Sequence, residues 1–165
     1  TGTLSMNAVS PAGERTIGNP SATRNLLLRA ANRIPDDLLL AAARVFPAAV
    51  FWQSGRTKVD GFAINDTARY LFAEEYRLPL LDPALAASLA ATAEHLFPLL
   101  LLLGLGTRFA AAALLAMTVV IQLFVYPDAW ATHGTWAALL LLLVARGPGR
   151  WSLDALIARR YGKSP

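Results

Sequence analysis

The chain has 165 residues, of which 55% are hydrophobic and 16% are charged, whereas about a quarter of the residues of a typical soluble domain are charged. It contains no cysteine, which excludes disulfides, thiolate metal sites and thiol redox chemistry. The net charge of +4 does not indicate nucleic-acid binding, because the arginines lie at the ends of apolar stretches and not in one patch. This composition predicts an integral membrane protein in a lipid bilayer.

The first predicted segment, residues 1–36, precedes the apolar part of the chain. Residues 7–23 are rich in Ser, Pro, Gly and Asn, which predicts little packed structure. Leucines and arginines are mixed over residues 24–34, and Pro35 follows. This pattern favours a short amphipathic helix on the membrane surface that ends at the proline.

The first predicted span, residues 37–55, carries a charged residue, Arg44, and a proline, Pro47. A cation inside a span needs a partner or water. We predict an Arg44–Glu94 ion pair, because antiparallel packing of the first two spans would bring both groups to similar depths. The alternative is that the Arg44 side chain extends to the nearer membrane surface.

The segment 56–82 joins the first two spans and is too long for a tight turn. Asn65 or Asp66 can cap a short helix over residues 67–76, because both residue types accept hydrogen bonds from a first helical turn. We interpret the whole segment as a surface lid over the bundle.

The second predicted span, residues 83–104, places Glu94 and His95 near its middle. Ionisable groups are costly inside a membrane, so these two residues are candidates for a functional site. A structural polar lock between helices is the alternative. At 100° per residue the large leucines fall opposite Glu94 and small residues fall on its side, which predicts that Glu94 faces neighbouring helices.

The third and fourth predicted spans are residues 109–126 and 129–145, and their most polar members are Gln122 and His133. The basic C-terminal segment, residues 147–165, follows them. Ser152 can cap a short helix there that continues to residue 160.

These elements predict an all-α fold, a polytopic membrane protein with an antiparallel bundle of four transmembrane helices over residues 37–146. Short interfacial helices are expected at both ends. Lys and Arg are more numerous on the side of the two termini, so we expect both termini to be cytoplasmic and segment 56–82 to face outward. The expected location is the inner membrane of a bacterial cell.

Several short patterns follow one another in an order that resembles the DoxX family of small four-helix membrane proteins. The patterns are Arg44, Ser54-Gly55-x-x-Lys58, Ala93-Glu94, Leu102-Leu-Gly104-Leu-Gly-Thr-Arg108 and Gly147-Pro-Gly-Arg-Trp-Ser-Leu-Asp154. Their order and spacing over residues 38–154 carry the resemblance, since each alone is weak. The chain departs from the family at residues 94–98, where relatives commonly have a glycine-containing stretch, so a bulkier and more polar group stands there.

The resemblance implies an accessory membrane subunit that anchors or serves a redox assembly of membrane or peripheral proteins. Any enzymatic role would be that of one subunit of a quinone-linked oxidoreductase, not catalytic alone, and a homo-oligomer is compatible with the sequence. No catalytic residue is predicted. A quinone headgroup needs hydrogen-bond partners in an apolar slot. The candidate quinone-binding residues are Glu94, His95, Gln122 and His133.

Two other functions fit the same residues. One is a small transporter or cargo-binding protein in which Arg44, Glu94 and His95 line a substrate path. The other is a scaffold without a small-molecule ligand. His95, His133 and Glu94 lack the local spacing of a zinc motif, so no metal site is predicted.

Overall fold

The structure is a computed structural model that describes residues 35–76, 78–79 and 81–162. The amphipathic helix predicted over residues 24–34 lies outside the described residues. Four of the described helices are long and apolar enough to cross a membrane, which confirms the predicted four-span fold. They are α2 (Asp36–Arg56), α4 (Pro83–Leu103), α5 (Thr107–Phe124) and the stretch Pro127–Arg146, most of which is α6 (Trp130–Arg146).

Polar N-caps begin three of the helices, as the sequence predicts. The Asp82 carboxylate accepts hydrogen bonds from the N–H groups of Ala84 and Leu85 at 3.0 Å each, and Pro83 opens α4. In the same way Asn65 caps α3 (Asp66–Tyr70), and Ser152 caps α7 (Leu153–Arg160). These side chains satisfy helix N–H groups that have no partner within their own helix.

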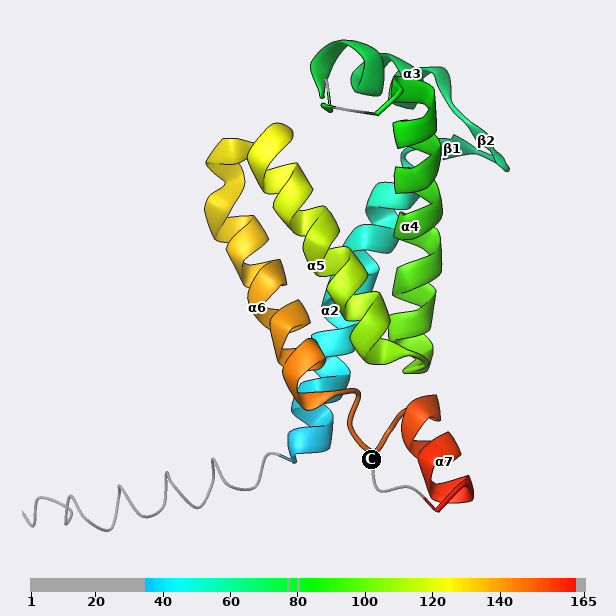
Figure 1. The fold of residues 1–165 in the computed structure, drawn as a ribbon, viewed down its shortest axis with the longest axis vertical. Helices are drawn as coiled ribbons and strands as arrows, with labels where there is room; N and C mark the ends of the chain where they lie inside the picture. Colours follow the sequence, from blue (N-terminus) through cyan, green and yellow to red (C-terminus); the bar gives the residue numbers. More distant parts are fainter. Residues whose placement is uncertain (1–34, 77, 80, 163–165) are drawn as a thin grey trace, which may run out of the picture. The chain divides into compact units, whose positions relative to one another are not determined.

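The segment between α2 and α4 contains more structure than the sequence predicts. A two-stranded antiparallel hairpin, β1 (Val59–Asp60) and β2 (Ala63–Ile64), comes first. The predicted helix over 67–76 is present, but its second half is a π-helix, η1 (Leu71–Glu75). A 3-10 turn, η2 (Pro127–Ala129), joins α5 to α6. We call the end of the bundle that carries the hairpin and α3 the hairpin end, and the opposite end the α7 end (Figure 1).

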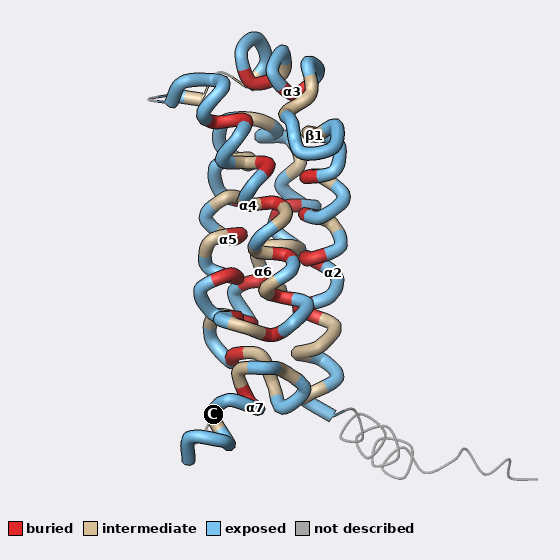
Figure 2. The backbone as a smooth tube through the Cα atoms, turned by 90° about the vertical axis from the view of Figure 1, so that its right-hand side faces the viewer, coloured by how far each residue is buried: buried red, intermediate tan, exposed pale blue. Residues whose placement is uncertain are grey.

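The bundle core is made by small and branched apolar residues that all four long helices turn inward (Figure 2). Leu101, Leu114, Leu140 and Leu143 are fully buried in it. The prediction that Glu94 faces the neighbouring helices while the large leucines of α4 lie on the opposite side is confirmed. Leu89 is 52% exposed, whereas Glu94 is 1% exposed. In a chain with four such spans, the exposed leucine face is the surface that contacts lipid.

The helices α2 and α4 are antiparallel but staggered. Arg44 of α2 lies level with Leu101 of α4, to whose carbonyl it donates, and Ser54 lies level with Glu94. Consequently α2 ends at about the depth of Glu94, and the hairpin projects from the side of α4 rather than from its tip (Figure 1). This stagger determines which residues meet at each end of the bundle.

Candidate functional site

The buried carboxylate of Glu94 is held by Ser54 in the last turn of α2 and by Lys58 just beyond the end of that helix. Lys58 Nζ lies 2.7 Å from Glu94 Oε2, and Ser54 Oγ donates to Glu94 Oε1 at 3.0 Å. Lys58 Nζ also donates to Ser54 Oγ at 3.0 Å, which closes a three-membered network. The lysine and glutamate side chains are only 14% and 2% exposed, so this is a buried ion pair inside the bundle.

The predicted Arg44–Glu94 ion pair is wrong. The Arg44 guanidinium donates to two backbone carbonyl oxygens, those of Leu101 and Trp151, near the α7 end. Leu101 is seven residues, or two helical turns, beyond Glu94 along α4, which is about 10 Å at 1.5 Å per residue. The prediction assumed that the start of the first span lies level with the end of the antiparallel second span, and the stagger of α2 removes that condition. The Arg44 guanidinium is directed toward the nearer end of the bundle, as in the alternative, but it is 5% exposed because backbone carbonyl groups of the protein hold it there.

The residues that carried the DoxX resemblance gather at two places in the structure. Ser54, Gly55 and Lys58 meet Glu94 toward the hairpin end; a Cβ on Gly55 would lie 3.0 Å from Glu94 Cβ, so glycine permits this close approach. The second place is at the α7 end. There Arg44 holds the last turn of α4, through Leu101 O, to the segment before α7, through Trp151 O.

Asp154 completes the second cluster. Its two carboxylate oxygens accept from the N–H groups of Gly106 and Thr107 at 2.8 and 2.9 Å, and its own N–H donates to Gly104 O at 2.9 Å. Asp154 thus caps α5 from a distant part of the sequence. Gly104 has φ of 65°, and a Cβ there would lie 2.3 Å from Arg44 Nη1, so only glycine fits.

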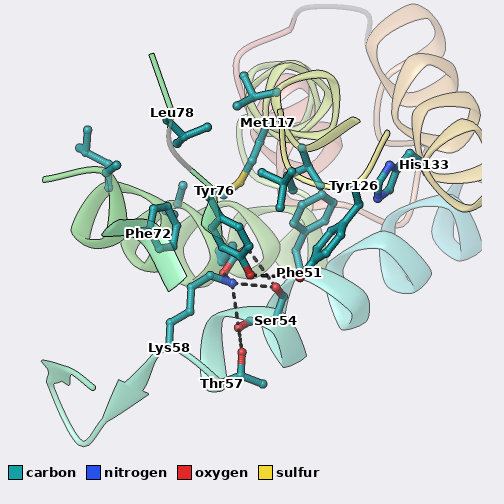
Figure 3. Close-up of a pocket in the computed structure, with 18 of the residues that line it drawn as sticks. Phe51, Ser54, Thr57, Lys58, Phe72, Tyr76, Leu78, Met117, Tyr126 and His133 are labelled. Carbon is teal, nitrogen blue, oxygen red and sulfur yellow. Dashed lines mark hydrogen bonds and ion pairs between the residues drawn. The ribbon is translucent and has the colours of Figure 1, made fainter. Parts of the chain in front are cut away.

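A cavity of about 440 Å³ adjoins the Lys58–Glu94 pair. Its wall comes from α2, η1, α4, α5 and α6, and is mostly apolar (Figure 3). The polar side chains that line it are Ser54, Thr57, Lys58, Tyr76, Glu94, Tyr126 and His133. An apolar cavity with a few polar groups directed into it is the usual form of a small-molecule site.

Two tyrosines lie together on this wall. The hydroxyl oxygens of Tyr76 and Tyr126 are 3.2 Å apart, so one hydroxyl donates to the other and the second keeps its own hydrogen for another acceptor. Burial, followed by the hydrogen bond and charge of Tyr126, raises the pKa of Tyr76 above the ordinary tyrosine value. Tyr76 therefore remains a neutral phenol at physiological pH.

The tautomer of His133 is fixed by its neighbour Gln122. The Gln122 side-chain N–H₂ donates to Pro127 O at 2.5 Å, which turns the amide oxygen Oε1 toward His133 Nδ1 at 2.7 Å. Because that oxygen can only accept, Nδ1 carries the hydrogen and Nε2 of the neutral ring is an acceptor. His133 itself is 5% exposed and lines the cavity.

The four predicted quinone-binding residues divide in the structure. Glu94 and His133 line the cavity, and Gln122 supports His133. His95 lies elsewhere: its ring packs at 5.1 Å from Trp52, and its Nδ1 bonds Ala91 O of its own helix at 2.6 Å. His95 and His133 therefore do not share a site.

The sequence predicted no role for Lys58 and placed neither Tyr76 nor Tyr126 in the candidate site. Lys58 carried a signal, because it was one of the family-motif residues and follows the first span directly. The tyrosines carried only the weak signal of aromatic residues near the ends of spans. Their meeting depends on the fold of η1, which periodicity did not indicate.

Four apolar helices around a buried ion pair and a mostly apolar cavity define a multi-pass helical membrane protein that resides in a lipid bilayer. The DoxX family model matches residues 39–127, more than half of the chain. This chain belongs to the DoxX family. No curated protein and no solved structure matches it.

Proposed function

We propose that this DoxX-family protein is a membrane-embedded accessory subunit of a redox assembly, and that its cavity binds the headgroup of a quinone. The observation that carries the proposal is the cavity of about 440 Å³ beside the Lys58–Glu94 pair. A mostly apolar wall suits the ring and the first part of an isoprenoid tail, and the polar groups suit the ring oxygens.

Access from the bilayer favours a lipid-soluble ligand. Leu89 of α4 and Val120 of α5 line the cavity and are 52% and 39% exposed. The two helices diverge toward the hairpin end (Figure 1). A ligand dissolved in the acyl chains can therefore reach the cavity between α4 and α5 without crossing a charged surface.

The polar residues fit a quinone in their hydrogen-bonding roles. The free hydroxyl hydrogen of the tyrosine pair is a donor for a carbonyl oxygen, and His133 Nε2 is an acceptor for a hydroxyl. The three N–H donors of Lys58 are taken by Glu94 Oε2, Ser54 Oγ and Ser54 O, so Lys58 contributes a fixed positive charge at the wall. A bound quinone would supply exchange of two electrons and two protons. Glu94 holds the Lys58 charge at the wall, and Gln122 holds the His133 proton at Nδ1.

The transporter alternative depended on Arg44, Glu94 and His95 lining one path. Of these three, Glu94 alone lines the cavity, and Arg44 is engaged at the α7 end. The scaffold alternative is tested together with quinone binding.

The test is quinone extraction from protein purified with its native lipids in a mild neutral detergent. We expect stoichiometric quinone in the wild type and a large loss in His133→Leu. His95→Leu is the matched control, because it removes the same group outside the cavity, and it should retain the quinone. Wild-type protein that stays free of quinone even after quinone is added would contradict the proposal, and so would equal retention by the two variants.

The accessory role is tested separately by mass spectrometry of gently solubilised complexes. We expect redox proteins to co-purify with the chain. If partners co-purify but no quinone is found, the scaffold function replaces the quinone-binding one. If the chain purifies alone from its native membrane, the accessory role is wrong.

A further inference from the structure

A second cavity, of about 600 Å³, lies at the α7 end, between the start of α5, the end of α6 and α7. Its wall includes three arginines, Arg108, Arg146 and Arg150, and one carboxylate, that of Asp154. The lining thus carries an excess of positive charge. The cavity plays no part in the proposed quinone site, which adjoins Glu94 nearer the hairpin end.

Some of these charges already have partners. The Asp154 carboxylate accepts from two backbone N–H groups of the α5 start, and Arg150 Nε lies 4.0 Å from Asp37 Oδ2. Within residues 35–76, 78–79 and 81–162, Arg108 and Arg146 have no acidic partner within 4.0 Å. The Arg108 side chain lies over Gly147, where a Cβ would come within 3.3 Å of Nε, so it is placed at the cavity wall.

A buried hydroxyl at the same cavity lacks a partner. Thr107, the first residue of α5, is 0% exposed and lines the cavity. Its Oγ1 has no hydrogen-bond partner among the described residues. A buried hydroxyl is rarely left unpaired, because it loses its bonds to water and gains none in return.

We propose that this cavity binds a phosphate group. Two arginines without acidic partners offer planar pairs of N–H donors that match phosphate oxygens, and Thr107 Oγ1 offers one more hydrogen bond. Phe109 also lines the cavity and is 68% exposed, so the cavity opens where the apolar surface of α5 begins. The end of a membrane span is the place where we expect phospholipid headgroups. The phosphate is carried by an anionic phospholipid or by a small soluble compound.

The test measures the unfolding midpoint of the full chain in neutral detergent against the concentration of three probes at constant ionic strength. The probes are phosphatidylglycerol, phosphatidylcholine and inorganic phosphate. We expect the unfolding midpoint to rise and then saturate as phosphatidylglycerol or inorganic phosphate is added, and we expect no rise with phosphatidylcholine. A rise with the lipid alone assigns the site to a headgroup, and a rise with inorganic phosphate assigns it to a soluble compound.

The double variant Arg108→Gln/Arg146→Gln should weaken the apparent affinity by about tenfold or more, because hydrogen bonds to charged groups contribute on that scale. Arg56→Gln/Arg69→Gln removes the same charge near the hairpin end and should leave the affinity unchanged. Thr107→Ser should bind as the wild type does, and Thr107→Val should bind more weakly. The proposal is overturned if no probe gives a saturable rise, or if the two double variants lose affinity equally.

Discussion

Lys58 reaches Glu94 from beyond the last residue of α2, with 2.7 Å between its Nζ and Glu94 Oε2. The contact exists because α2 ends at about the depth of Glu94, so that a residue from the connecting segment can enter the bundle. A charge pair from a loop and a span therefore closes one side of the candidate site.

Removal of Lys58 should destabilise the protein strongly. Lys58→Met leaves the buried Glu94 carboxylate without its counter-charge, and in soluble proteins such a loss costs about 3–5 kcal/mol. Glu94→Gln should cost less, because the amide keeps a hydrogen bond to Ser54. In the double variant Lys58→Met/Glu94→Gln, the decrease in the free energy of unfolding should be close to that of Glu94→Gln alone. The free energies are measured by unfolding in detergent micelles.

A second mutant cycle serves as the control for that pair. Arg44→Leu and Glu94→Gln should be additive within about 0.5 kcal/mol, because the two residues are two turns apart and share no partner. Strong coupling between Arg44 and Glu94, together with additivity between Lys58 and Glu94, would contradict the arrangement described above.

Gly104 should not tolerate a side chain. In Gly104→Ala the new Cβ meets Arg44 Nη1 at 2.3 Å and Ser152 Cα at 2.9 Å, and the residue must also keep a φ of 65°. Gly106→Ala has a similar φ of 56° but nothing within 4 Å. We expect Gly106→Ala to be destabilised by about 1–2 kcal/mol, which is the cost of a side chain in the left-handed conformation. Gly104→Ala should be destabilised clearly more. Equal losses in thermal unfolding would argue against the Arg44 clamp.

The cap that Asp154 provides to α5 should be measurable. Asp154→Asn keeps one acceptor oxygen but turns an N–H₂ group toward the other backbone N–H, so the cost should be about 1 kcal/mol. Asp128→Asn, in the exposed η2 turn, removes the same charge without such a role and should be neutral. A neutral Asp154→Asn in chemical unfolding would show that the cap does not stabilise the bundle.

Tyr76 should give the protein an alkaline loss of stability. Its pKa in the folded protein is raised above the ordinary 10.0, so the folded state keeps a proton that the unfolded state releases. The stabilisation is complete below pH 10 and falls as the pH rises toward the folded pKa. The free energy of unfolding of Tyr76→Phe should decline less steeply with pH than that of the wild type. Tyr161 is exposed, and Tyr161→Phe should show the same decline as the wild type.

Hydropathy was sufficient to place the four spans, and the capping residues Asp82, Asn65 and Ser152 were sufficient to place three helix starts. The stagger of α2 was not predictable, because the relative depth of two antiparallel helices depends on side-chain packing and on how the connection folds. That error alone gave Glu94 the wrong partner.

The hairpin was missed for a different reason. Two-residue strands are too short to show an alternating pattern. Lys58 was therefore predicted to lie beyond the end of the first span, on the side of Arg44, and not inside the bundle. Gln122 and His133 were recognised as polar residues in apolar surroundings, but their contact depends on the η2 turn that brings α5 and α6 together.

The most direct test of quinone binding is photolabelling of the wild-type protein in bilayers with a photoreactive quinone, followed by peptide mapping. We expect adducts on the cavity-facing residues of α4 and α5, such as Ala90 and Met117, and we expect an excess of unlabelled quinone to suppress them. Adducts confined to the lipid-facing leucines, unaffected by competing quinone, would contradict the account.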